Sequence, residues 1–517
     1  MTPATLDAVR QVLPAWTIWL PLAAPLAALP IAYGLASLGV LVAGSGLRRL
    51  PPDAHWTERA RHVSTLRRTI LLMTPLPVLA TVPFAVGGPV SMGRGLVLPT
   101  VLAVALACVV AVAFRAENRW VRRIPAGARV RSFLALLLVA CAGLVAPLVL
   151  LALRPFAPQV GLGAWLLSLV AVSAVFTFGG GLLLARLVGL VRAPPARLVE
   201  ALVRALPPGV RPPRVRVVRV LSANAFAIPW SRTILVTEGA LEHLDDDGLA
   251  AVLAHELEHL REPLAVRALR PLFGVASGLV FPVAISVAVA PELVARPPLG
   301  LVAALAVALA YLAAAFFYQR LLLRMEARSD AAAHAASPAY ATALDTIYRV
   351  NLAPAVQGRK TSHPDLVERF AEAGVSPPWP VPPPPPSPWP AVATVAFCTF
   401  VLAAGLLVAR LVAARSARDE RGCLVAVALE GRANDLANLA IVRFTRGAPA
   451  EAAPLFRAAA ELRPADARWP AWEAMSLATA GKCQEASAAL TAAAALAQGN
   501  LGYTAGAQAA LASCTPR

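Results

Sequence analysis

The sequence predicts a mainly α-helical, polytopic membrane protein that also carries a small α/β portion and a C-terminal α-helical repeat tail. Hydrophobic residues fill 58% of the 517 positions, and the mean hydropathy is +0.65. Soluble domains are about 45–50% apolar, so the excess indicates helices that lie in lipid. Apolar runs of about 20 residues, long enough to cross a bilayer, recur along the chain.

About eight of these runs are expected to be membrane spans. Five form an N-terminal transmembrane region over 1–188, two form a hairpin at about 271–318, and one precedes the tail. The first run lacks a clear small-residue cleavage site, so we expect a retained helix and not a signal peptide. The runs lie at about 15–45, 69–90, 95–114, 133–153, 161–188, 271–291, 298–318 and 391–413.

Arginines in the loops predict how the spans are oriented. The net charge is +18, and the arginines cluster in the loops 46–68 and 115–132, whereas the alternate loops are nearly bare. Because positively charged loops stay in the cytoplasm, the N-terminus and the tail are expected outside, and segment 189–270 inside. Arginines that follow the last span, at 410–421, oppose this placement of the tail. No motif indicates nucleic-acid binding, so no nucleic-acid partner is expected.

The stretch AVLAHELEHLREP contains an H-E-x-x-H pattern on an expected helix. His255 and His259 are four residues apart and share one helical face, so their imidazoles can bind one zinc ion. Glu256 can take a proton from a zinc-bound water, whose pKa the ion lowers towards neutrality. A packed helix with solvated histidine and glutamate side chains is the alternative interpretation.

A catalytic zinc ion needs a third protein ligand, and the segment LLLRMEARSDAAAHA provides a candidate. Glu326 lies just after the expected hairpin returns to the side of the membrane that holds the H-E-x-x-H pattern. Asp330 follows one helical turn later and can accept a hydrogen bond from the other ring nitrogen of a ligating histidine. Without the histidine pair, the same carboxylates would indicate only a solvated helix face.

Four segments together resemble motifs of the HtpX and CAAX-prenyl-protease group of integral-membrane zinc metallopeptidases. They cover about a third of the chain: SANAFAIP at 222–229, ILVTEGALEHLDDDGLAAVLAHELEH at 234–259, EARSD at 326–330 and TSHPDLVERF at 361–370. The resemblance implies a zincin-like α/β catalytic domain over 189–376, with one zinc ion per chain. It also implies a bacterial inner (plasma) membrane protein whose active site faces the cytoplasm.

The resemblance also implies a role for each matched residue. It makes His255, His259 and Glu326 the zinc ligands, Glu256 the general base, and Asp330 a support for a ligand.

Further matched residues would surround the substrate. Asn224 and Ala225 would lie on an edge strand that pairs with the substrate backbone. Arg369 and His363 would lie near the cleft, where His363 either stabilises the oxyanion or is an ordinary turn residue. Glu258 departs from the family, which usually has a small glycine at that position.

The segments after the catalytic domain predict a spacer, a span and a helical tail. PPWPVPPPPPSPWP at 377–390 is typical of a polyproline-II linker. Residues 414–517 are expected to form a tetratricopeptide-like domain, because Gly447 recurs as Gly481 at a 34-residue offset and several alanines do the same. Such repeats could bind a protein partner on a concave surface. A generic alanine-rich helical hairpin is the alternative.

Cysteines in the tail offer a test of where the tail lies. In an oxidising compartment outside the membrane, Cys483 and Cys514 could form a disulfide and leave Cys423 free.

These features predict a membrane-embedded zinc metalloendopeptidase that cleaves peptide bonds at the cytoplasmic face, in the turnover of membrane or misfolded proteins. Its partners would be protein or peptide substrates, the lipid bilayer and a possible protein bound by the tail. Two other functions stay open: a signal-transducing membrane metallopeptidase regulated by the C-terminal domain, and a non-catalytic membrane scaffold.

Overall fold

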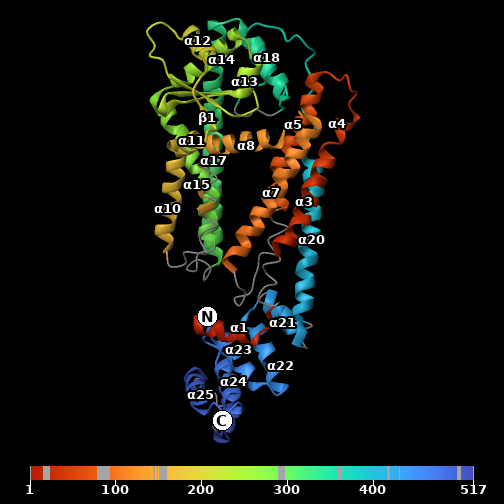
Figure 1. Ribbon diagram of the computed structural model, residues 1–517, viewed down its shortest axis with the longest axis vertical. Coiled ribbons are helices and arrows are strands. Elements are labelled where there is room, and N and C mark those ends of the chain that lie inside the picture. Colours follow the sequence, from red (N-terminus) through yellow and green to blue (C-terminus); the bar gives the residue numbers. More distant parts are fainter. Residues whose placement is uncertain are drawn as a thin grey trace. The chain divides into compact units, whose positions relative to one another are not determined.

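The computed structural model divides the chain into two compact units (Figure 1). One unit comprises Met1–Gly39, Leu72–Val112 and Val392–Arg517, and the other comprises Val40–Leu71 and Ala113–Ala391. The residues described are 2–15, 24–77, 94–141, 143, 146–147, 149–150, 160–288, 297–358, 363–415, 420–429, 431–497, 502 and 504–515.

A four-stranded sheet lies at the centre of the second unit. Its strands run in the order β1-β2-β4-β3, and β2 pairs with β4 in parallel while the other two pairs are antiparallel. β3 is therefore an edge strand. Alternation along β2 gives the sheet two different faces, because Val215 and Val217 enter the core and Arg214 and Arg216 point to the other side. The strands are β1 Val191–Arg192, β2 Arg214–Val218, β3 Ala225–Ile228 and β4 Thr233–Thr237.

Helices cover both faces of this sheet. The first face packs on α12, α14 and α18 around residues such as Leu198, Leu253 and Tyr340. The second face packs on α8 and α11 around Leu190 and Leu235. The helices are α4 Ser45–Arg49, α8 Ala126–Ala140, α10 Leu162–Val175, α11 Gly181–Leu187, α12 Ala196–Ala205, α13 Glu238–His243, α14 Asp246–Leu260, α15 Leu264–Ala288, α17 Pro297–Ala336, α18 Ala339–Asn351 and α19 Leu366–Glu372, with a π-helical turn Phe176–Gly180 and a 3₁₀ turn Pro229–Ser231.

Helix α14 carries the H-E-x-x-H pattern and has clear start and stop signals. The Asp245 side chain caps its N-terminus by accepting a hydrogen bond from the Gly248 amide at 2.7 Å. Asp246 and Asp247 in the first turn favour the positive end of the helix dipole. The chain turns by 94° before α15, where Pro263 follows the helix end.

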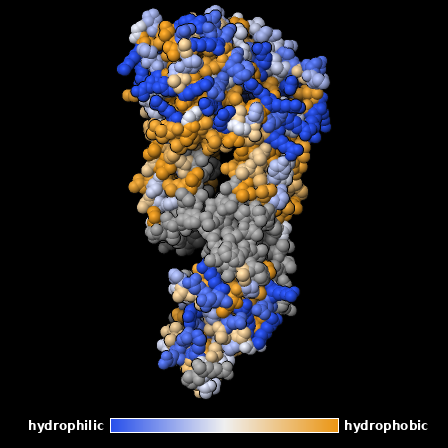
Figure 2. All heavy atoms as spheres, in the orientation of Figure 1, coloured by the Kyte–Doolittle hydropathy of each residue, from blue (hydrophilic) through white to orange (hydrophobic). Residues whose placement is uncertain are grey.

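Two helices are long and apolar enough to cross a membrane, Gly163–Leu187 and Leu305–Ala336. Only 17% of the most apolar stretch of the first, and none of that of the second, is buried within the protein. Their exposed side chains include Leu167, Leu312 and Phe317. Figure 2 shows a hydrophobic zone below the more hydrophilic upper part of the molecule. These unburied apolar helices suggest a membrane protein.

The expected number of about eight spans is not found. In the described parts of the chain there are two candidates, or up to three if the bent pair α14–α15 counts as one span. At the first and last runs, shorter apolar stretches are found among the described side chains, at Ala28–Ala43 and Trp389–Gly405. The runs at 15–45, 69–90, 133–153 and 271–291 include positions outside the described residues, so the count of two or three applies to the described residues.

The proline-rich segment after α19 is anchored along its length. Trp379 is buried, and its indole nitrogen donates to Asp345 at 2.7 Å. Further on, Thr65 donates to the Pro386 carbonyl at 2.8 Å, and Arg61 to the Pro384 carbonyl. The segment has no helix or strand up to residue 388, but it packs against other parts of the second unit and is not a free spacer.

The first unit contains the helical tail. Gly447 and Gly481 occupy equivalent turns of two successive helical hairpins, and both have φ = +81°, which favours glycine. Whether these hairpins are tetratricopeptide repeats stays a prediction. The helices are α1 Pro3–Val12, α21 Glu420–Leu429, α22 Ala433–Thr445, α23 Pro449–Leu462, α24 Arg468–Thr479, α25 Cys483–Ala497 and α26 Ala505–Ala512, and four belong to both units: α3 Ala24–Ala43, α5 Trp56–Met73, α7 Arg94–Trp120 and α20 Trp389–Arg415.

A disulfide links the last two helices of the tail. Cys483 and Cys514 form a disulfide that joins the start of α25 to the segment after α26, while Cys423 is buried and lies outside this disulfide. The disulfide considered from the sequence is thus present in the structure.

The N-terminal helix α1 packs on α23 of the tail. Val9 and Leu13 are buried in one apolar cluster with Phe456 of α23. The Thr2 hydroxyl donates to the Glu461 carboxylate at 3.2 Å. The first residues of the chain therefore complete the hydrophobic core of a domain near its other end.

Candidate active site

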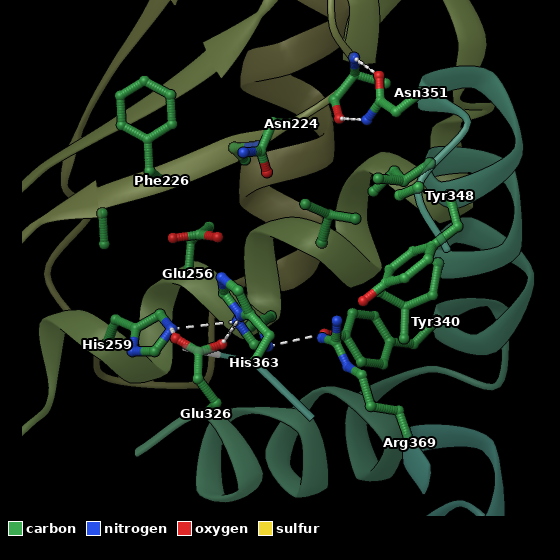
Figure 3. A pocket seen from close by; sticks show the side chains of 18 of the residues that line it. Asn224, Phe226, Glu256, His259, Glu326, Tyr340, Tyr348, Asn351, His363 and Arg369 are labelled. Carbon is green, nitrogen blue, oxygen red and sulfur yellow. Dashed lines mark hydrogen bonds and ion pairs between the residues drawn. The ribbon is translucent and has the colours of Figure 1, made fainter. Parts of the chain in front are cut away.

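A cavity of about 460 Å³ opens beside α14 and contains all the residues that the sequence assigned to metal and substrate, except Asp330. It is lined by α14, α17, α18, the edge strand β3 and the segment before α19 (Figure 3). Of the TSHPDLVERF motif, residues 361 and 362 lie outside the described residues, whereas His363 and Arg369 reach the cavity.

Three side chains converge at the base of this cavity. His255 and His259 come from successive turns of α14 and Glu326 from α17, and each is at least 94% buried. The two Nε2 atoms lie 3.1 Å apart, and the Glu326 carboxylate oxygens lie 3.5 Å from His255 Nε2 and 3.3 Å from His259 Nε2. Ligand atoms on a tetrahedral zinc ion with bonds of about 2.0–2.1 Å would be about 3.3 Å apart. The three groups therefore fit such an ion.

A buried hydrogen-bond network fixes the first histidine. His255 Nδ1 lies 3.0 Å from Asp330 Oδ1 and 2.7 Å from the Tyr340 hydroxyl, which itself donates to Asp330 at 2.7 Å. Arg369 Nε donates to the other Asp330 oxygen at 2.7 Å. Burial raises the pKa of Tyr340 well above its usual value, so this hydroxyl stays protonated. Asp330 thus holds the proton on Nδ1, which leaves Nε2 of His255 free to bind a cation.

A second network fixes His259. Its Nδ1 lies 2.8 Å from Glu262 Oε1 and 3.3 Å from the Ser329 hydroxyl. Arg270 Nε donates to Glu262 Oε2 at 2.8 Å, and the Glu262 side chain is almost fully buried. Sequence reasoning missed both Glu262 and Tyr340. Glu262 had a local signal, because it follows His259 by three residues, whereas Tyr340 is brought in by the packing of α18 on α14.

Glu256 lies beside the three converging groups. Its carboxylate is buried, and within the described part of the chain no ion pair or hydrogen bond holds it. Figure 3 shows it between Glu326 and the strand that carries Phe226 and Asn224. This position leaves the carboxylate available to a water molecule or substrate in the cavity.

The edge strand and its support form the opposite wall of the cavity. Asn224 accepts from the Thr237 amide at 3.0 Å, and its side chain accepts from the Ala225 amide at 2.9 Å. Asn351 of α18 clamps the residue before, because its side chain both donates to and accepts from the Ala223 backbone. These bonds fix the start of β3 where it lines the cavity.

Two expected cleft residues contact the site in different ways: His363 contacts one of the three converging groups, and Arg369 contacts the network that holds His255. His363 is half-exposed and its Nδ1 lies 2.8 Å from Glu326 Oε2. Arg369 lines the cavity but is 5% exposed, and its guanidinium contacts Asp330 and Tyr340. The structure thus places Arg369 in the support of His255, a role that the motif alone did not indicate.

Glu258 has charged partners on two helices. Its side chain is buried, and it pairs with Arg261 at 3.3 Å and with Arg328 at 2.5 Å. Arg328 lies on α17 between Glu326 and Asp330, so the pair links the two helices that carry the converging groups.

Comparison with known proteins agrees with this geometry. Residues 196–374 match the family model described as Peptidase family M48. A stretch of 81 residues is 42% identical to a protein named Protease HtpX homolog from Pyrococcus furiosus, and it covers 15% of this chain and 27% of that relative. The chain therefore spans about a quarter of the length of that relative. No solved structure matches the chain. Motifs, geometry and match agree that residues 196–374 are similar to the HtpX-like metallopeptidases of the M48 family.

Proposed function

We propose that the protein is a zinc-dependent metalloendopeptidase that hydrolyses peptide bonds at the cytoplasmic face of a bacterial inner membrane. The observation that supports this most is the convergence of His255, His259 and Glu326, with Glu256 beside them in an open cavity. Two imidazoles and one carboxylate, with room for a fourth ligand, are the donor set of a catalytic zinc site.

The residues of the cavity divide the chemistry among them. A bound zinc ion would supply a polarised, acidified water to the site. Glu256 accepts the proton of that water and later delivers it to the leaving amine. Asp330 and Tyr340 keep His255 in one tautomer, and Glu262 does the same for His259, so neither imidazole has to reorganise during the reaction.

The substrate backbone would lie along the edge strand β3. Strand addition suits this position, because β4 occupies only one side of β3 and the other side faces the cavity. Ala225 and Ala227 carry small side chains, which leave the cavity open to the side chains of different substrates. Such backbone recognition suits an enzyme that removes misfolded or membrane proteins of varied sequence.

Membrane location and a tail outside the cytoplasm complete the proposal. The unburied apolar helices support a membrane location. The disulfide supports a tail outside the cytoplasm, because disulfides persist in oxidising compartments. The tail's helical hairpins would then bind a protein partner outside the membrane.

The proposal is tested by purifying the full chain in detergent, measuring its metal content, and assaying casein cleavage by the wild type and Glu256→Gln. We expect one zinc ion per chain in both proteins. Cleavage should fall about 10²–10⁴-fold in the variant, because the general base is lost while the ligands remain. Equal cleavage by the two proteins, or a wild type without stoichiometric zinc, would contradict the proposed mechanism.

A further inference from the structure

A second cavity, of about 190 Å³, lies between α11 and the face of the sheet opposite the active site. Its lining combines two kinds of side chain. Leu182 and Leu183 come from the end of the candidate span Gly163–Leu187, and Arg214 and Arg216 come from β2. The cavity therefore has an apolar wall that continues a membrane helix and a basic wall on the sheet.

Three arginines make this cavity strongly positive. Arg214 and Arg216 are two residues apart on one strand and share its face, and Arg186 joins them from α11. Among the residues that the structure describes, none of the three has a carboxylate partner. Their neighbours Arg192 and Arg219, by contrast, both pair with Glu238. The sheet thus neutralises some of its arginines and leaves this group available for an anionic ligand.

Two exposed aromatic side chains connect the span to the sheet region. Phe178, in the span, and Trp230, in the turn after β3, meet edge to face with ring centroids 6.4 Å apart. Both are exposed, Phe178 at 50% and Trp230 at 39%. Tryptophan side chains of this kind are typical of the boundary between hydrocarbon and headgroups.

We infer that this cavity binds the headgroup of an anionic phospholipid. The guanidinium groups of Arg186, Arg214 and Arg216 would hold the phosphate, and Leu183, which is 59% exposed, would lie against an acyl chain. The exposed leucines favour a lipid over a free phosphate ion, which would gain nothing from an apolar wall. This inference depends on the proposed membrane location, but not on peptidase activity.

Such a lipid would touch the sheet that carries the edge strand. β2 pairs with β4, and β4 pairs with β3, so a headgroup held at β2 lies two strands from the cavity where substrate would bind. The lipid would thereby fix the height of the catalytic sheet above the bilayer.

The test uses the full chain, purified in detergent and stripped of lipid, and native mass spectrometry with added phosphatidylglycerol or phosphatidylcholine. We expect the wild type to prefer phosphatidylglycerol. Arg214→Gln with Arg216→Gln should weaken phosphatidylglycerol binding about thirtyfold, from about 1 kcal/mol for each arginine near an anionic headgroup. The matched control is Arg197→Gln with Arg204→Gln, which removes the same charge from α12 on the opposite face of the sheet.

Retained zinc and an unchanged circular dichroism spectrum show that the variants are folded. Equal binding of the two lipids by the wild type, or an equal loss in the control variant, would overturn the inference. So would displacement of phosphatidylglycerol by millimolar inorganic phosphate, which would assign the site to a free ion. Glu256→Gln should bind lipid as the wild type does, so failure of the lipid site and failure of the proposed peptidase are distinguishable.

Discussion

At the scale of single residues, both histidines of the proposed metal site are supported by carboxylates. His255 and His259 are held by different carboxylates, Asp330 and Glu262, and each carboxylate itself accepts a hydrogen bond from an arginine. A ligand that is already oriented loses little entropy when it binds a metal ion.

Replacement of Glu262 by glutamine should weaken zinc binding about 10–100-fold, because an amide orients His259 less firmly than a carboxylate does. Competition with a chromogenic chelator measures this affinity. Glu242→Gln, a change of the same kind at an exposed position of α13, is the control and should bind zinc as the wild type does. If Glu262→Gln keeps the wild-type affinity, the assigned role of Glu262 is wrong.

The pair Glu258–Arg328 should couple α14 to α17 with a free energy of about 1 kcal/mol. The value is small because Arg328 is 48% exposed, and solvent screens a pair of that kind. A double-mutant cycle of Glu258→Gln and Arg328→Gln, followed by thermal unfolding, measures it. Strictly additive effects of the two changes would show that the pair does not connect the helices.

At the scale of secondary structure elements, the disulfide is the strongest constraint on the tail. It closes a loop of 31 residues around α25 and α26. Replacing both Cys483 and Cys514 by serine should destabilise the tail by about 3–4 kcal/mol, by the loop-closure entropy of a segment of that length. Thermal unfolding with and without reductant measures this change. A wild type whose melting temperature does not respond to reductant would contradict the prediction.

Residues of the site that lie on one helix could be predicted from the sequence, whereas those brought together by helix packing could not. The pairs His255–His259 and Glu326–Asp330 were predictable, because i, i+4 spacing on a helix is a local property. Tyr340 could not be found in this way, since its contact with His255 spans 85 residues and depends on how α18 packs against α14.

The number of membrane helices was predicted least well. Hydropathy reports that a run is apolar but not whether it is one continuous helix. Within the run at 15–45, the helix α3 covers Ala24–Ala43, and residues 16–23 lie outside the described residues. Of the sheet, the resemblance gave the edge strand, which the structure places at Ala225–Ile228, whereas β2 and its parallel pairing with β4 were not predicted.

At the scale of the whole molecule, the proposed topology predicts which positions meet an external reagent. Cysteines introduced at Asp7 and Arg468, both exposed, should react with a membrane-impermeant maleimide in intact cells. A cysteine at Asp53, in an arginine-rich loop expected in the cytoplasm, should react only after the cells are opened. If only Asp53→Cys is labelled in intact cells, the orientation is the opposite of the proposed one.

The packing of α1 on α23 limits how many times the chain between them can cross a bilayer. Two segments that share one hydrophobic core must be in the same compartment. The chain between them then crosses the membrane an even number of times, so a total of three crossings is excluded whatever the orientation. A cut in a segment between α1 and α23 would therefore leave the two pieces joined by this hydrophobic core, without a covalent bond.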